Sequence, residues 1–269
     1  MKGTLRITLL LAAVSAAPLA AQAVMNPPPP PSVLWIQREL VKAGKGPAHN
    51  DWEAGWPAAF GKSNWPTTYL GANALTGSNE AWFFIGYPSF EAMEKDLAQS
   101  DANAPLSAEL KRLTGGDSDY LESSSAVLLQ YMPSVSYKPV VDLPKMRYFE
   151  IIRYAVRPGH EGDFIKAATI YKDGFAKAGI DNHWATYRVV SGMPAGTYLV
   201  IVPMRSLSMF DRTGSEDEAM ARALGPEQMG ALGKLVSDGF ATIQSQVFAF
   251  NPKMSYVSKE WKAADTFWR

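Results

Sequence analysis

The sequence predicts an α+β protein made of two consecutive units with one shared order of elements, strand-helix-strand-strand-helix-strand. Two observations predict it: a short motif recurs near the end of each half, and strand-like and helix-like apolar patterns alternate in the same order in both halves. The composition agrees, because 47% of the 269 residues are hydrophobic, the net charge is zero and cysteine is absent. These values disfavour a disordered chain, a disulfide scaffold, a zinc ribbon, a thiol enzyme and a basic nucleic-acid-binding protein.

The first residues predict an export signal. Lys2 and Arg6 precede a short apolar run over residues 7–14, and Ala21 and Ala23 form the small-x-small pattern of a signal-peptidase site. The apolar run is too short for a stable membrane anchor. We therefore expect a signal peptide over 1–23, a periplasmic or secreted mature protein, and no stable membrane insertion after cleavage. A proline-rich spacer, 24–32, follows and favours an extended conformation.

The repeat is clearest in the motif Pro-x-x-Ser-Tyr, which occupies residues 133–137 and 252–256 and follows a strand-like run in both places. Shorter matches upstream pair residues 82–85 with 198–201 and residues 68–69 with 186–187. Similar spacings over this distance indicate a duplication. We expect unit 1 over 33–141, unit 2 over 146–257 and a C-terminal tail over 258–269. The motif itself has a structural reading, in which proline ends a strand and tyrosine folds the chain back.

Unit 2 shows the order of elements most clearly. Aromatic and β-branched residues predict a first strand that stops at a Pro-Gly turn, and an apolar stripe at helical spacing predicts a helix that ends at Gly179. Two further strands flank the turn at 191–196, and a second helical region precedes the last strand. The expected strands are 147–156, 184–190, 197–204 and 246–251, and the expected helical regions are 164–178 and 220–243.

Unit 1 repeats the order. Its first strand ends near Gly44, and Trp52, Trp56 and Phe60 recur at helical spacing. The other expected strands are 67–72, 81–86 and 126–132, with helical pieces around 90–97 and 106–113. The order βαββαβ is the ferredoxin-like split βαβ unit, whose sheet buries one face under its helices. Because the other face also needs cover, we expect the two units to pair.

Residues 148–164 carry a resemblance to a known family. A strand containing Glu150 and Arg153-Tyr154 runs into the turn Arg157-Pro158-Gly159 and a helix that begins near Asp163-Phe164. This segment resembles NIPSNAP-like members of the dimeric α/β-barrel superfamily, whereas unit 1 matches only loosely. The resemblance implies a barrel-like pair of units within one chain, with a cavity between helices and sheet. Superfamily members use that cavity for haem, aromatic polyketides or aldoximes, so the fold alone does not indicate the function.

Histidines are the first candidates for chemistry. His183 lies in Asp181-Asn182-His183-Trp184 at the mouth of a strand, so His183 and Asn182 are the candidate catalytic residues. The alternative is a structural turn, because the counterpart in unit 1, Ser63-Asn64-Trp65, has no histidine. His49 and His160 follow the glycine-proline turns and are expected to be solvated.

Metal and nucleotide sites are not expected. No two histidines stand three or four residues apart, and the phosphate-loop, Rossmann and serine-elbow motifs are absent. The sequence therefore predicts no metal and no cofactor, with haem kept as an alternative through the family resemblance.

Eight tryptophans are many for this length, and five of them fall in unit 1. They fill a core or line a pocket for a flat apolar ligand. In the second case Arg38 or Arg153 would orient an acidic group on the ligand. The expected ligand-binding residues are Trp35, Arg38, Arg153, Trp184 and Tyr187. In the tail, Trp261 and Trp268 stand at helical spacing and predict a short docked helix.

The sequence thus predicts an exported soluble protein that binds a small apolar or aromatic molecule in a dimeric α/β-barrel-type cavity. The alternative is a cofactor-independent monooxygenase or haem-handling enzyme of the same superfamily. A structural module that works through surface contacts is a third reading. Whether the protein is an enzyme, which ligand it takes and whether it forms a homo-oligomer stay open.

Overall fold

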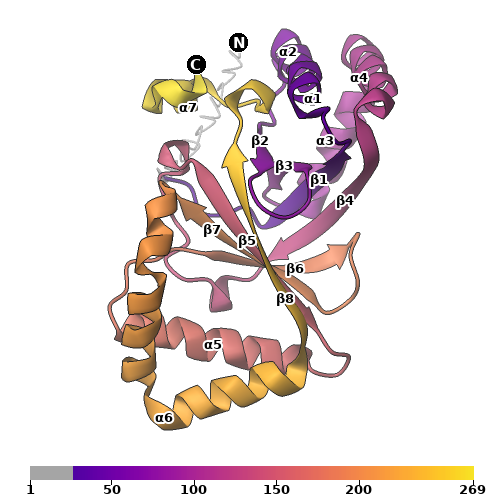
Figure 1. Cartoon of the computed structure of the whole chain (residues 1–269). Helices are drawn as coiled ribbons and strands as arrows, with labels where there is room; N and C mark the ends of the chain where they lie inside the picture. Colours follow the sequence, from indigo (N-terminus) through magenta and orange to yellow (C-terminus); the bar gives the residue numbers. More distant parts are fainter. Residues whose placement is uncertain (1–26) are drawn as a thin grey trace, which may run out of the picture.

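The computed structural model describes residues 27–269 (Figure 1). The expected signal peptide and residues 24–26 of the expected spacer lie outside the described residues. The first half contains β1 (Val33–Val41), α1 (Gly46–Glu53), α2 (Gly55–Lys62), β2 (Tyr69–Ala74), β3 (Glu80–Tyr87), α3 (Phe90–Ala102), α4 (Ala104–Gly116) and β4 (Leu121–Tyr131). The second half contains β5 (Tyr148–Val156), α5 (Glu161–Lys177), β6 (Ala185–Ser191), β7 (Thr197–Met204), α6 (Thr213–Gly239) and β8 (Phe240–Phe250), and α7 (Lys259–Ala264) follows. Short 3-10 helices are Asp117–Asp119, Pro133–Val135, Leu143–Lys145, Leu207–Arg212, Pro252–Met254 and Thr266–Trp268.

The strands close into one antiparallel barrel with the order β1-β3-β2-β8-β5-β7-β6-β4. Each half contributes four neighbouring strands, and the two sets join at two seams. One seam pairs Ala72 of β2 with Phe250 of β8, and the other pairs Leu129 of β4 with Val189 of β6. The expected α+β class and the barrel formed within one chain are therefore confirmed.

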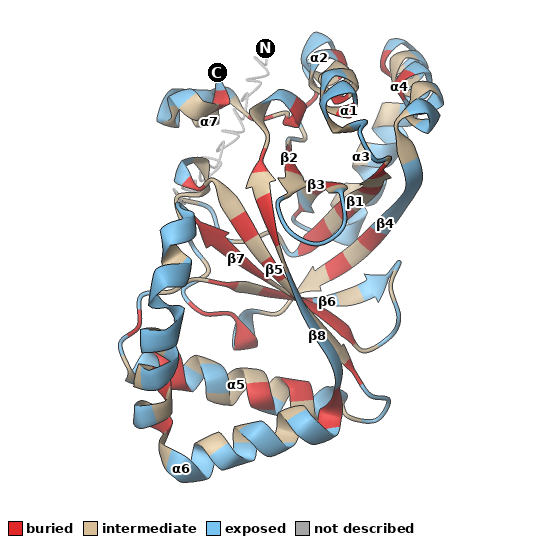
Figure 2. Ribbon diagram, in the orientation of Figure 1, coloured by how far each residue is buried: buried red, intermediate tan, exposed pale blue. Residues whose placement is uncertain are grey.

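The barrel interior is the main hydrophobic core and is shared by both halves. Side chains alternate across each strand, so every second residue points inward. The ring of Phe84 meets that of Phe149 at 5.2 Å between centroids, and Trp82 meets Phe248 at 4.6 Å. In Figure 2 the buried positions concentrate on the strands, while α1–α4 gather at one end of the molecule and α5 and α6 at the other. The outer face of the sheet in each half is thus left for its own helices.

Two strands begin earlier than the sequence predicts. β4 starts at Leu121 rather than near residue 126, and β8 starts at Phe240, inside the region expected to be helical. Both early segments pair with one neighbour only, β1 or β5, and most of their side chains are exposed. Their sequences therefore lack the apolar alternation that marks a half-buried strand. Ile243, expected on a helix, is a strand residue with 50% of its surface exposed.

The repeated Pro-x-x-Ser-Tyr motif makes the same contacts in both halves. The hydroxyl of Ser136 accepts a hydrogen bond from the backbone N–H of Thr186, and the hydroxyl of Ser255 accepts one from Gly71. Tyr137 then exchanges backbone hydrogen bonds with Trp184, as Tyr256 does with Tyr69. The motif has a structural role, but it does not fold the chain back onto its own unit. It fastens the exit of β4 to β6 of the second half, and the exit of β8 to β2 of the first half.

The tail docks as expected. Trp268 is 3% exposed and packs against Phe250, and its indole N–H donates to the carbonyl of Pro144 at 2.7 Å. Among residues 27–269, no helix combines the length and the apolar character needed to cross a bilayer.

Candidate functional site

In both halves a cavity lies between the outer face of the sheet and the helices that cover it. The first-half cavity has a volume of about 340 Å³. Its lining contains nine polar or acidic residues and seven aromatic ones, Trp35, Trp56, Phe60, Trp65, Tyr69, Phe83 and Tyr87. Glu39 and Glu53 are also part of the lining. A cavity lined by aromatic side chains together with polar groups is a common form of a small-molecule site.

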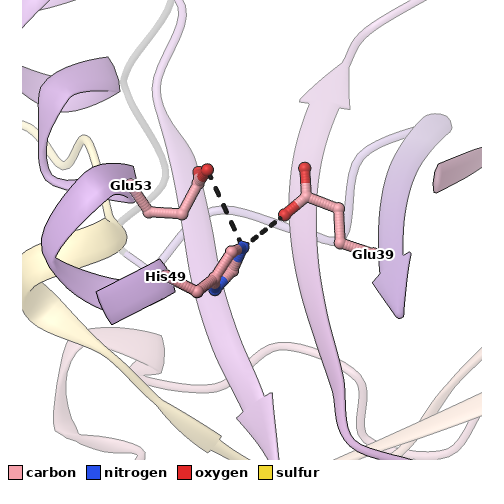
Figure 3. A group of neighbouring side chains, drawn as sticks. All are labelled: Glu39, His49 and Glu53. Carbon is pink, nitrogen blue, oxygen red and sulfur yellow. Dashed lines mark hydrogen bonds and ion pairs between the residues drawn. The ribbon is translucent and has the colours of Figure 1, made fainter. Parts of the chain in front are cut away.

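Glu39 and Glu53 belong to a buried cluster with His49, referred to below as the EHE cluster (Figure 3). Glu39 comes from the outer face of β1, and His49 and Glu53 stand four residues apart on α1, where they share one helix face. Nε2 of His49 lies 2.9 Å from Oε2 of Glu39 and 3.8 Å from Oε1 of Glu53. All three residues are buried, His49 with only 1% of its surface exposed.

Several buried polar atoms in and beside the EHE cluster lack a hydrogen-bond partner. Nδ1 of His49 and Oε1 of Glu53 are buried without a hydrogen-bond partner, and so is the hydroxyl of the neighbouring Tyr69. Within residues 27–269 neither carboxylate forms an ion pair with lysine or arginine. Burial, together with the negative charge of Glu39, raises the pKa of Glu53 to about 9. Burial and Glu39 also raise the pKa of Asp117, another lining residue, to about 6.

The sequence reasoning missed this cluster. It compared histidines only with other histidines, and it expected His49 to be solvated because the residue follows a glycine-proline turn. That expectation is wrong, since α1 begins at the turn and its first turn places His49 against Glu39 of β1. The spacing of His49 and Glu53 was the signal available in the sequence. The contact with Glu39, in contrast, depends on where α1 lies on the sheet.

The second-half cavity, of about 380 Å³, lies between the sheet, α5 and α6. Trp184 and Asn182 line it together with the acidic residues Glu150, Glu216 and Asp217. The indole N–H of Trp184 donates to the carbonyl of Val135 at 3.0 Å, which fixes the ring in the wall. Two of the expected site residues thus reach a cavity here, and Trp35 reaches the one in the first half.

His183 does not line either cavity. Its Nδ1 lies 2.8 Å from the carbonyl oxygen of Lys138, and its backbone N–H donates to the side chain of Asn182 at 2.7 Å. Asn64, the counterpart of Asn182, has a positive φ of 48°. Both asparagines therefore serve their turns, which favours the structural reading of this segment. His160 is half-exposed at the start of α5, with Nδ1 2.8 Å from Asp163.

Three expected ligand-binding residues face the other side of the sheet. Arg38 and Arg153 alternate with the cavity-lining residues of β1 and β5, so they point toward the barrel interior. The guanidinium of Arg38 lies over the ring of Trp82 and near Glu80, and that of Arg153 contacts Gln244. Tyr187 is part of the barrel core, where its hydroxyl donates to the carbonyl of Pro31. The expectation that an arginine orients an acidic ligand in a cavity is therefore wrong.

Comparison with known proteins identifies the fold. No family model matches the chain, and no curated protein matches it. Among solved structures, an anthrone oxidase-like protein has 11% identity and a TM-score of 0.54, with 84% of this chain and 94% of that chain covered. A monooxygenase candidate from Fusobacterium nucleatum has 9% identity and a TM-score of 0.53, with 82% and 93% covered. The likeness shows that the chain has the fold of dimeric α/β-barrel proteins.

Proposed function

We propose that this protein binds a small, flat, mostly apolar molecule in the first-half cavity. The observation that carries the proposal is an aromatic wall around a cavity of about 340 Å³ in which buried polar atoms lack partners. Such atoms are costly to bury unpaired, and a ligand hydroxyl or amine at this place would pair with them. The aromatic rings supply the stacking area and the EHE cluster supplies the polar contact.

The charge of the lining sets the class of ligand. Glu39, Glu53, Asp96 and Asp117 line the first-half cavity, and none of the lining residues is basic. A ligand carboxylate would lie beside these acids and be repelled, whereas a neutral phenol or an amine would not. The ligand is therefore neutral or cationic, not acidic.

A matched set of probes tests this. We expect 1-naphthol and 1-naphthylamine to quench the fluorescence of the wall tryptophans on binding, and 1-naphthoate to bind at least about tenfold more weakly. Ser100→Phe fills the first-half cavity and is expected to weaken naphthol binding by about tenfold or more. The matched control is Ala168→Phe, which fills the second-half cavity and should leave naphthol affinity unchanged.

Two results would contradict the proposal. One is loss of naphthol binding in Ala168→Phe but not in Ser100→Phe, which would assign the ligand to the second half. The other is a lack of saturable binding of any of the three probes to the folded protein.

Oxidation of the bound molecule is a second candidate function. It is favoured by the aromatic cavity together with the fold shared with an anthrone oxidase-like protein. Oxygen uptake is measured with anthrone as the substrate, in the wild-type chain and in Ser100→Phe. A rate above the background that Ser100→Phe abolishes would support oxidation. A rate equal to background would contradict oxidation and would leave ligand binding as the only proposed function.

The placement of His183, the candidate residue for haem handling, does not support that alternative. His183 is engaged with Lys138 and is absent from the lining of both cavities, and His49 lies between two carboxylates. We therefore assign no step to haem.

The origin and location of the chain are proposed as well. We infer that the two halves are ferredoxin-like repeats, because the sheet orders β2-β3-β1-β4 and β6-β7-β5-β8 correspond. The NIPSNAP-like type is proposed from the resemblance of residues 148–164 alone. We also propose export to the periplasm or beyond, supported by residues 1–23. A mature N-terminus at Val24, determined by mass spectrometry of the native protein, would test it.

A further inference from the structure

We propose that the EHE cluster is a binding site for a divalent transition-metal ion such as Zn²⁺. One imidazole nitrogen and two carboxylates are a common donor set for these ions. The sequence predicted no metal site, because no two histidines stand three or four residues apart. The proposal differs from that prediction. It concerns the same cluster that would contact the proposed ligand, but it does not require that ligand.

The spacing of the donor atoms fits one ion. The three ligand atoms lie within 4.8 Å of one another, with 2.9 Å and 3.8 Å from Nε2 of His49 to the two carboxylates. Ligands about 2.1 Å from a metal at angles of 90–110° stand about 3.0–3.5 Å apart. Small side-chain rotations would therefore bring all three donors to bonding distance.

The two carboxyl groups of the cluster also favour a cation. Among the described residues, 27–269, neither of the two buried carboxyl groups pairs with lysine or arginine. Oε1 of Glu53 has no hydrogen-bond partner, although it lies 3.8 Å from Nε2 of His49. A buried carboxylate without a counter-charge is costly. A divalent ion would neutralise both carboxylates together.

The ion would also be accessible. Glu39 and Glu53 line the first-half cavity, whereas His49 lies outside the lining. The protein would thus supply three ligands from one side and leave the remaining coordination positions directed toward the cavity. Sites with three protein ligands and an open position are typical of metals that bind or activate a small molecule.

A titration without any organic ligand tests the site. The full-length protein is freed of metal with EDTA and titrated with ZnCl₂ by calorimetry, and thermal unfolding is recorded with and without Zn²⁺. We expect one saturable site and a rise in Tm with Zn²⁺. Glu53→Gln keeps the shape of the side chain, so it is expected to stay folded and to weaken Zn²⁺ binding by about 100-fold. His49→Ala should abolish the rise in Tm.

The matched control is His160→Ala. This histidine also contacts a carboxylate, that of Asp163 at 2.8 Å, but it is half-exposed and outside the cluster. Its removal should leave Zn²⁺ affinity unchanged. The proposal is overturned if the folded wild-type chain shows no saturable Zn²⁺ binding, or if Glu53→Gln binds Zn²⁺ as tightly as the wild type. The naphthol assay is run with EDTA present, so failure of ligand binding and failure of metal binding are distinguished.

Discussion

Replacing Phe248 by alanine is expected to lower the free energy of unfolding by about 3–5 kcal/mol. Phe248 is fully buried in the barrel interior, where its ring lies 4.6 Å from that of Trp82. It belongs to β8, the strand that joins the two halves at the seam with β2. The cavity left by the ring would thus open between the halves, where neither half can close it alone. Urea unfolding, monitored by circular dichroism, measures the loss.

The control for Phe248 lies on the same strand. Ile243→Ala removes another large hydrophobic side chain, but one that is half exposed. Its loss of free energy of unfolding is expected to be well below that of Phe248→Ala. Similar losses for the two variants would show that the barrel interior does not carry the stability assigned to it.

Gly192→Ala is expected to lower the free energy of unfolding by more than the roughly 1–3 kcal/mol that a strained backbone conformation costs by itself. Gly192 has a φ of +91°, and an added Cβ would lie 2.1 Å from the carbonyl oxygen of Ala126. That carbonyl belongs to β4, so the turn after β6 would have to move away from the second seam between the halves. Both the free energy of unfolding and the slope of the urea transition are measured.

Gly179→Ala separates backbone strain from the clash. Gly179 also has a positive φ, of +66°, but nothing lies within 4 Å of its added Cβ. Its substitution should cost only about 1–2 kcal/mol, the cost of a left-handed conformation for alanine. If the two glycine variants lose the same stability, the contact of Gly192 with Ala126 is not a constraint on the seam.

Much of the fold could be predicted from local patterns. The strand at β7 was predicted with its observed bounds, Thr197–Met204, because it is a continuous apolar run between turn residues. The helix at α5 was predicted from one apolar stripe. The starts of β4 and β8 could not be predicted, because exposed strand segments such as 121–126 carry polar residues and depend on a partner strand for their hydrogen bonds.

The candidate site could also be predicted only in part from the sequence. His49 and Glu53 stand four residues apart, so the sequence contains their common helix face. Trp35 and Trp184 were expected to line a cavity and do. Arg38 and Arg153 were assigned to the wrong face, because position on a strand does not say which of its two faces meets the helices.

The sequence by itself determined the order of elements, the positions of the repeated motif and the helical spacing of the tail. All of these depend on residues close together in the chain or on periodicity within one element. The tertiary structure decided the closure of the barrel and the meeting of Glu39 with His49. Both require strands and helices from separate segments to pack in one register, and that register depends on the shared core and not on any single segment.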